Sequence, residues 1–298
     1  MDTRLLRTFL ALARTGSFTA AAAELHLAQS TVTVQIRALE KELGTQLFDR
    51  LPRGATVTEA GRRLLEEAEA VLDAEARLRA AAAGGPPAGR VAVGAGETLC
   101  SARLPGVIAA LRRSHPGVEV DLEPAGTAAA VEGLRTGRLD IALLLEEEVS
   151  FPGIVAEPLA REPLVLLCAP GHPFAHRNEP VTWEELARET FFLHEQGCSY
   201  SDRLAHRLLS VPGARIRLTR FGSIEAARSC VAAGLGLTLL PRATVEDALR
   251  EGRLAVVGGP PFPDVPVSVA RHGRRWVSPA ARAVVAELTR HFPAATGP

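Results

Sequence analysis

The N-terminal part of the chain carries three short apolar repeats separated by turn residues. Between residues 3 and 15, apolar side chains recur at the spacing of one helix face, which predicts a helix with Asp2 or Thr3 as its N-cap. An alanine-rich repeat then predicts a second helix, capped by Ser17 or Thr19. The first helix can cover the apolar backs of the two helices that follow it.

The third helix is expected to open at Ser30, after a break at residues 26–29, and to end at Gly44. The side chains on the face opposite its apolar stripe are short, mostly polar and uncharged. Hydroxyl and amide groups near a helix N-terminus can reach base edges in the DNA major groove, and the helix dipole favours phosphate there. The pattern therefore predicts a helix-turn-helix, whose third helix has as its apolar stripe Val32, Ile36, Leu39 and Leu43.

A basic turn follows the third helix. Short apolar runs at residues 46–49 and 55–57 flank a turn that contains Pro52 and Gly54, which predicts two strands. Such a hairpin makes residues 1–58 a winged helix-turn-helix DNA-binding domain.

Residues 59–83 predict one long helix. Leu64, Val71 and Leu78 repeat every seven residues with Ala68 between them, a seam that favours dimerisation with a second copy of the chain. The alternative is an amphipathic helix packed on its own domain. Residues 84–90 are rich in glycine and proline and predict a hinge.

Short apolar runs alternate with helical repeats in residues 91–298, which predicts an α/β effector-binding domain with a largely parallel sheet. The pattern divides into subdomain I, about 91–161 and 266–298, and subdomain II, about 162–265. Two similar halves imply a cleft between them.

Charge and composition narrow the class of protein. The 298 residues have a net charge of zero, and residues 1–58 carry only two more basic than acidic side chains. A net charge this small attracts DNA only weakly in a monomer, and a dimer would double the charge. No apolar run approaches the roughly 18 residues of a membrane span, and the N-terminus lacks the pattern of a signal peptide, so we expect a cytoplasmic protein.

With these elements in this order, the whole chain resembles the LysR-type transcriptional regulators. The resemblance lies in the segments FLALARTGSFTAAAAELHLAQSTVTVQIRALEKELGTQLFDR, TVTEAGRRLL, LRRSHPGVEV, LRTGRLDIALL, GHPFA and VAAGLGLTLLP. It implies a homodimer, often a dimer of dimers, that binds a double-stranded promoter dyad, with RNA polymerase as a possible further partner. It also implies an effector domain similar to periplasmic binding proteins, in which a small molecule alters DNA bending.

One departure concerns the reading helix. Family members usually carry a basic residue at the position of Val34, so this chain lacks one phosphate or guanine contact. We expect a set of polar side chains to face the bases and backbone and a set of arginines to contact phosphate. The first set is Gln29, Ser30, Thr31, Thr33 and Gln35, and the second is Arg37, Arg50 and Arg53.

The resemblance places effector contacts at four turns of the α/β domain. Backbone N–H groups and hydroxyls at strand-to-helix turns form anion sites, so a carboxylate is the leading class of effector. Glu97 argues partly the other way, because its carboxylate would repel an anion or select an amine-bearing ligand such as an amino acid. Some of these residues could instead be simple helix caps. The expected contacts are Gly96, Glu97, Thr98, Gly126, Thr127, Gly197, Cys198, Ser199, Tyr200 and Ser223.

The sequence leaves two alternative functions open. Cys198 lies where peroxide-sensing relatives keep a reactive cysteine, with His194, Arg203 and Arg207 near in sequence, so a redox-sensing regulator is one alternative. Residues 91–298 alone would also fit a solute-binding protein, but the first 58 residues favour a regulator. No nucleophile with a nearby base, nucleotide fingerprint or metal-ligand cluster is evident, so we expect neither an enzyme nor a bound cofactor or metal.

Overall fold

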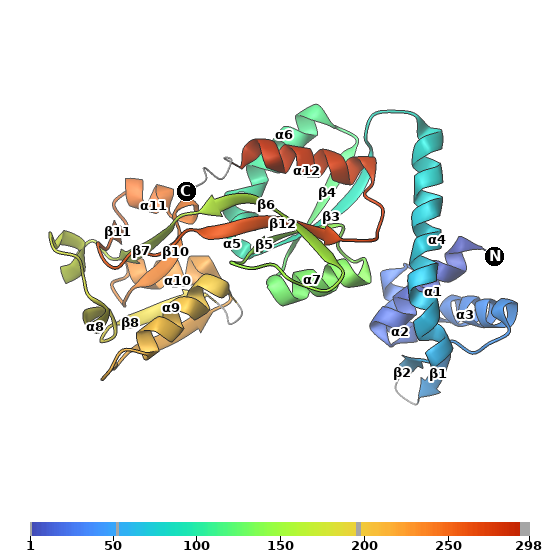
Figure 1. Cartoon of the computed structure of the whole chain (residues 1–298), viewed down its shortest axis with the longest axis horizontal. Helices are drawn as coiled ribbons and strands as arrows, with labels where there is room; N and C mark the ends of the chain where they lie inside the picture. The colour runs from blue at the N-terminus through green and yellow to red at the C-terminus, as the bar shows by residue number, and fades with distance from the viewer. Residues whose placement is uncertain (1, 52–53, 195–197, 293–298) are drawn as a thin grey trace. The chain divides into compact units, whose positions relative to one another are not determined.

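The computed structural model describes residues 2–51, 54–194 and 198–292. The chain divides into two compact units. The first holds residues 1–85 with 274–278, and the second holds 86–273 with 279–298. Figure 1 labels their elements, and each unit is described by itself below.

The first unit opens with the three expected helices, α1 (Thr3–Thr15), α2 (Phe18–Glu24) and α3 (Gln29–Leu43). Side chains of Asp2 and Ser17 accept hydrogen bonds from the first turns of α1 and α2, as the sequence predicts. The predicted cap at Ser30 is wrong. Helix α3 begins at Gln29, its N-cap is Ala28, and no side chain caps it.

The core of this unit lies between α1, α2, α3 and the start of the next helix. Leu43 does not belong to it, against expectation, because its position at the end of α3 leaves it 39% exposed. A carboxylate-to-backbone link joins α3 to the following segment, since Glu40 Oε1 accepts from the amides of Leu47 and Phe48. The largest buried side chains here are Leu6, Phe9, Leu12, Ile36, Leu39 and Leu47.

The wing consists of β1 (Phe48–Leu51) and β2 (Gly54–Val57), paired antiparallel. Gly54 has a φ of +146°, and a Cβ at this position would lie 2.5 Å from the carbonyl oxygen of Gly16. Ala55 donates its amide to that same oxygen at 2.8 Å. Only glycine allows the wing to approach the turn between α1 and α2 this closely.

Helix α4 (Glu59–Ala83) is capped by Thr58, whose hydroxyl accepts from the amide of Gly61. One face of α4 packs on its own domain: Ala68 is buried there, and Leu64 and Leu72 contact the same core. Ala68 therefore does not contribute to a free seam.

The second unit is built on a five-stranded sheet in the order β4-β3-β5-β12-β6. Strands β4, β3 and β5 are parallel, whereas β12 runs antiparallel to both of its neighbours, so the sheet is mixed. Figure 1 shows α6 and α12 on one face of this sheet and α7 on the other. The strands are β3 (Gly89–Ala95), β4 (Val118–Pro124), β5 (Ile141–Leu145), β6 (Ile154–Glu162) and β12 (Val265–His272), and the helices are α5 (Glu97–Ala102), α6 (Leu104–Ser114), α7 (Thr127–Thr136) and α12 (Pro279–His291).

A second group of strands follows β6 after Pro163. Strands β10, β7 and β11 form an antiparallel sheet in that order, and β8 pairs with β9 in parallel. The strands are β7 (Leu164–Cys168), β8 (Thr190–His194), β9 (Arg217–Phe221), β10 (Thr238–Pro241) and β11 (Ala255–Val256), and the helices are α8 (Trp183–Leu186), α9 (Ser199–Leu209), α10 (Ile224–Ala232) and α11 (Glu246–Arg250), with 3-10 turns at Pro173–His176 and Arg242–Thr244.

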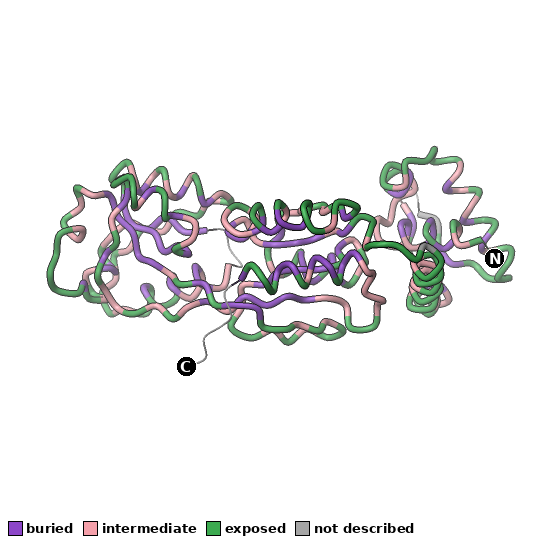
Figure 2. Tube along the Cα trace, turned by 90° about the horizontal axis from the view of Figure 1, so that it is seen from above, coloured by how far each residue is buried: buried purple, intermediate pink, exposed green. Residues whose placement is uncertain are grey.

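Burial follows this layering. Figure 2 shows buried strands between helices that are exposed on their outer faces. Near the start of the second strand group, the side chain of Glu162 is only 1% exposed and is paired with Arg103 Nε at 2.7 Å and Nη2 at 3.0 Å. Among the described residues, none of the helices combines the length and hydropathy that a bilayer crossing needs.

Candidate functional site

A cavity of about 300 Å³ lies where parallel strands of both strand groups end. Strands β3, β4, β5 and β8 finish at Ala95, Pro124, Leu145 and His194, and the residues at and after these ends line the cavity. This is the edge at which open α/β sheets bind ligands. We call it the effector pocket; it is lined by Gly96, Glu97, Thr98, Ala125, Gly126, Thr127, Ala128, Ala129, Leu143, Leu145, His194, Cys198, Ser199 and Tyr200.

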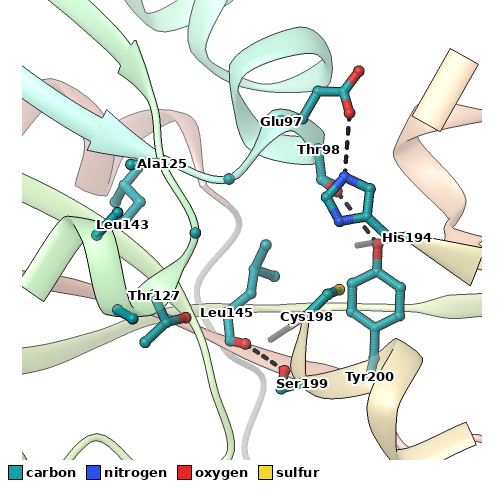
Figure 3. A pocket seen from close by; sticks show the side chains of 14 residues that line it. Glu97, Thr98, Ala125, Thr127, Leu143, Leu145, His194, Cys198, Ser199 and Tyr200 are labelled. Carbon is teal, nitrogen blue, oxygen red and sulfur yellow. Dashed lines mark hydrogen bonds and ion pairs between the residues drawn. The ribbon is translucent and has the colours of Figure 1, made fainter. Parts of the chain in front are cut away.

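Glu97 spans the effector pocket from α5 to the second strand group. Its Oε2 accepts from the amide of Ile224 at 2.8 Å and lies 3.2 Å from Nε2 of His194, a contact that Figure 3 draws. Its Oε1 accepts from the hydroxyl of Ser223 at 3.3 Å. The carboxylate therefore occupies the N-terminus of α10, where Ser223 makes no cap of its own.

Two further helices begin at the effector pocket without a side-chain cap. Gly126 is the N-cap of α7 and Cys198 is the N-cap of α9, and neither caps its helix with a side-chain hydrogen bond. Ser199 turns its hydroxyl away from its own helix and donates it to the carbonyl of Leu145 at 2.6 Å. Both helices thus present the positive end of their dipole to the pocket.

Acidic groups also lie near α7. The hydroxyl of Thr127 donates to Glu146, the residue directly after β5. Burial raises the pKa of the Glu146 carboxyl, and the Thr127 hydrogen bond opposes that rise. The carboxyl is therefore more easily protonated than an exposed one.

Tyr200 and Cys198 form the wall of the pocket on the side of α9. The hydroxyl of Tyr200 lies 3.5 Å from the hydroxyl of Thr98 on α5, and Figure 3 shows it beside the His194 ring. Burial raises the pKa of both the Tyr200 phenol and the Cys198 thiol. Because the thiolate is the nucleophile, the burial that raises this pKa disfavours a peroxide-reactive Cys198.

In the first unit, α3 presents a mostly polar face to solvent. Gln29, Ser30 and Arg37 are exposed, and Thr31 and Thr33 are half-buried. The hydroxyl of Thr33 donates to the backbone carbonyl of Gln29 at 3.1 Å.

Comparison with known proteins identifies both parts. Residues 3–62 match the family described as bacterial regulatory helix-turn-helix protein, lysR family, and residues 84–293 match the LysR substrate binding domain. The chain belongs to the LysR-type transcriptional regulators. It is a DNA-binding regulator with an effector-binding domain, and the fold expected from the sequence, a winged helix-turn-helix joined to an α/β effector domain, is confirmed.

Individual relatives cover almost the whole regulator. The Bacillus subtilis (strain 168) uncharacterized HTH-type transcriptional regulator YwqM is 34% identical and covers 97% of this chain and 99% of its own length. A full-length OxyR variant from Pseudomonas aeruginosa has 27% identity and a TM-score of 0.76, covering 99% of this chain and 96% of its own. Full-length CbnR complexed with its target DNA has 27% identity and a TM-score of 0.57, covering 98% of this chain and all of its own. These relatives are regulators, so the expectation that the chain is not an enzyme is confirmed.

In this LysR-type regulator most of the expected effector contacts line the pocket. Ser223 does not; it contacts Glu97 instead. Gly197 lies outside the described residues. The expected residues that do line the pocket are Gly96, Glu97, Thr98, Gly126, Thr127, Cys198, Ser199 and Tyr200.

Sequence reasoning missed the apolar floor of the pocket and His194 as a lining residue. The floor could have been found from the strand ends, because Leu143 and Leu145 come from β5, beside β3 in the sheet. His194 ends β8 in the same way, directly before a turn. The missed lining residues are Ala125, Ala128, Ala129, Leu143, Leu145 and His194.

One expected DNA contact, Gln35, differs in its surroundings from a plain exposed helix face. The side chain of Gln35 is half-buried and accepts a hydrogen bond from the hydroxyl of Thr8 on α1. Val34 is 63% exposed, so an apolar side chain stands in the middle of the reading face. Arg50 is a residue of β1, and Arg53 lies outside the described residues.

The seam expected on α4 divides along its length. Leu64 packs against the core of the DNA-binding domain, whereas Val71 is 39% and Leu78 71% exposed. Two of the three predicted dimerisation residues thus remain on the surface of the single chain. Within the described ranges, no group of three or more His, Cys, Asp or Glu side chains could hold a metal ion.

Proposed function

We propose that this regulator changes its DNA binding in response to a small carboxylate, with an amino-acid-like metabolite as the leading form, bound in the effector pocket. The observation that carries the proposal is the pair of uncapped helix N-termini, α7 and α9, that begin at the pocket wall. Free N–H groups and the positive dipole ends favour a carboxylate there.

Glu97 does not oppose such a ligand. Its Oε2 already accepts from the amide of Ile224 and lies 3.2 Å from Nε2 of His194, so this oxygen is directed to the start of α10 and not to the ligand's carboxylate. Its Oε1 makes only the longer contact with Ser223, which leaves room for an ammonium group of the ligand. An amino acid would then place its carboxylate at α7 and α9 and its ammonium group at Glu97.

For DNA, we propose that α3 reads the major groove and that the wing contacts the backbone. The structure of full-length CbnR in complex with its target DNA supports DNA binding by a chain of this fold, and a helix-turn-helix is the element that fits the major groove. The proposed reading and backbone residues are Gln29, Ser30, Thr31, Thr33, Gln35, Arg37, Arg50 and Arg53. We further propose that Val71 and Leu78, with Leu64 at the base, form the dimer seam.

The effector hypothesis is tested with matched triads of compounds. L-leucine, 4-methylpentanoate and 3-methylbutylamine share one apolar chain and differ only in their charged groups; shorter and longer triads extend the series. A ligand that binds the folded state raises the melting temperature of the full chain by mass action. We expect stabilisation by the carboxylate-bearing members of a triad, strongest for the amino acid, and none by the amine alone.

Ala128→Tyr is the control variant, because this exposed residue lines the effector pocket at the first turn of α7. It should abolish the stabilisation. The stabilising compound should also change the affinity of the wild-type chain for the promoter beside its own gene in a gel-shift titration. Stabilisation by amines alone, or an unchanged response in Ala128→Tyr, would contradict the proposal.

A further inference from the structure

A second cavity, of about 160 Å³, lies beside α9. It shares one lining residue with the effector pocket, Tyr200, so the Tyr200 ring lies between the two cavities. We call it the aryl cavity; it is lined by Leu164, Trp183, Tyr200, Arg203, Leu204, Arg207, Leu239, Phe262 and Pro263.

The size and walls of the aryl cavity suit one aromatic ring. An apolar cavity of roughly 150 Å³ is large enough to bind benzene. Leu204 and Leu239, which also line the cavity, are buried. Trp183 and Phe262 stand nearly perpendicular to each other, with ring centroids 5.7 Å apart, and both are only partly buried. A planar ring can pack against such walls with the edge-to-face geometry that aromatic groups prefer.

The charges at the aryl cavity have one sign. Its lining contains two guanidinium groups and no carboxylate. Arg207 is exposed, and its guanidinium carbon lies 5.3 Å from the centroid of the Trp183 ring. This arrangement holds a positive charge over an aromatic wall, as in cation–π pairs.

Arg203 adds an unused donor. Its Nη1 pairs with Glu147, but its Nη2 is buried and has no hydrogen-bond partner among the residues that the structure describes. A buried N–H group of a guanidinium without an acceptor is costly. A ligand oxygen at this end of the cavity would supply the acceptor after a small side-chain movement.

We propose that the aryl cavity binds a small aromatic monocarboxylate, with its ring against Trp183 and Phe262 and its carboxylate at Arg203 and Arg207. This site is separate from the effector pocket and goes beyond the function proposed above. Tyr200 lines both cavities, and its hydroxyl lies beside that of Thr98 of α5. A ligand in the aryl cavity would therefore contact a residue that also forms the wall of the effector pocket.

The test uses the only two tryptophans of the chain, Trp183 and Trp276. In a full-length Trp276→Phe variant, the remaining tryptophan fluorescence reports on the aryl cavity. Benzoate is the probe. We expect a saturable change in Trp183 fluorescence with benzoate, affinity at least about tenfold weaker for benzyl alcohol, and no change with acetate.

Matched variants in the Trp276→Phe background locate the site. Leu164→Tyr, which fills the cavity from a partly buried rim position, should abolish the benzoate response. Arg207→Gln, at an exposed position that is safe for folding, should weaken benzoate about tenfold, and Arg207→Lys should restore most of the affinity. Ala128→Tyr, which blocks the effector pocket, should leave the benzoate response intact.

Three results would overturn the inference. They are the absence of any saturable benzoate response, a response unchanged in both Leu164→Tyr and Arg207→Gln, and a response lost in Ala128→Tyr. The last would assign benzoate to the effector pocket and leave the proposed function standing.

Discussion

The carboxylate of Glu97 should stabilise the effector-binding domain by holding the first turn of α10. It accepts the amide of Ile224 at 2.8 Å, lies 3.2 Å from His194 Nε2, and accepts the Ser223 hydroxyl at 3.3 Å. Glu97→Ala removes all three contacts at once. The amide at the start of α10 is then left to solvent or to an anion.

The size of the effect follows from these contacts. A hydrogen bond to a charged group contributes about 1.5–3 kcal/mol. Because the Glu97 side chain is 32% exposed, we take the low end for the Ile224 bond and a small addition for the two longer contacts, which gives about 2 kcal/mol for the whole group. In a domain of about 200 residues this lowers the melting temperature by about 4–8 °C.

Calorimetry of the full chain measures this change. Glu97→Gln is the matched control, because it keeps the shape and one carbonyl acceptor but loses the charge, so it should lose about half as much stability as Glu97→Ala. Added acetate tests whether an external carboxylate can replace the lost one. If acetate enters the vacated site with a dissociation constant of about 10 mM, 100 mM acetate restores about 1.4 kcal/mol in Glu97→Ala.

Any binding of acetate at α7 and α9 stabilises both proteins alike, so the expected result is a larger stabilisation of Glu97→Ala than of the wild type, compared with chloride at equal ionic strength, because the wild-type carboxylate already fills the site at α10. The reasoning is refuted if Glu97→Ala melts within about 1 °C of the wild type, or if acetate stabilises both proteins equally. Either result would mean that the start of α10 gains nothing from Glu97.

Two further predictions concern the charged groups of this domain. Arg103→Ala strands the buried Glu162 carboxylate and should destabilise the domain by about 3 kcal/mol in urea unfolding, whereas the double change Arg103→Met with Glu162→Met should cost about 1 kcal/mol or less. Burial raises the pKa of Glu146 above its ordinary 4.5, so the favourable contribution of this carboxyl is complete below pH 4.5 and is lost as the pH rises through the folded-state pKa. Glu146→Gln stays neutral and should therefore gain stability relative to the wild type between pH 4 and pH 8, measured by melting in a pH series; a constant difference would contradict the assigned burial.

Local sequence rules predicted the parts of the fold that depend on nearby residues. The caps at Asp2 and Ser17 and the extent of the long helix are examples, since each depends on side chains within a turn or on an unbroken helical repeat. The rule failed at the start of α3, where Ala28 takes the N-cap position that a polar residue was expected to occupy. The packing of α1 on α4 determines which face of α4 is buried. Ala68 therefore lies in the core of its own domain and not in the expected seam, and capping rules carry no information about this.

The candidate site was harder to predict where it depends on distant pairs. Turn residues such as Gly96 and Gly126 were placed by the resemblance to LysR-type regulators, supported by the tendency of strand-to-helix turns to form anion sites. The bond between Glu97 and Ile224 joins positions 127 residues apart and has no signature in either local segment. Without it, Glu97 reads as a free acid facing the ligand, and the expected ligand charge changes sign.

The uncapped N-terminus of α3 offers the DNA-binding domain, which has little net positive charge, another way to bind phosphate. Because Ala28 has no polar side chain, the amides of Gln29 and Ser30 receive no cap from it, and both residues are exposed. A helix N-terminus of this kind binds phosphate through backbone N–H groups and the helix dipole, independently of basic side chains. We expect such a contact to offset part of the one that Val34 cannot make. A backbone amide adds no countercharge, however, so we expect a low affinity of each monomer for DNA. We propose that pairing through the exposed Val71 and Leu78 is the principal means by which the regulator gains affinity for a promoter dyad.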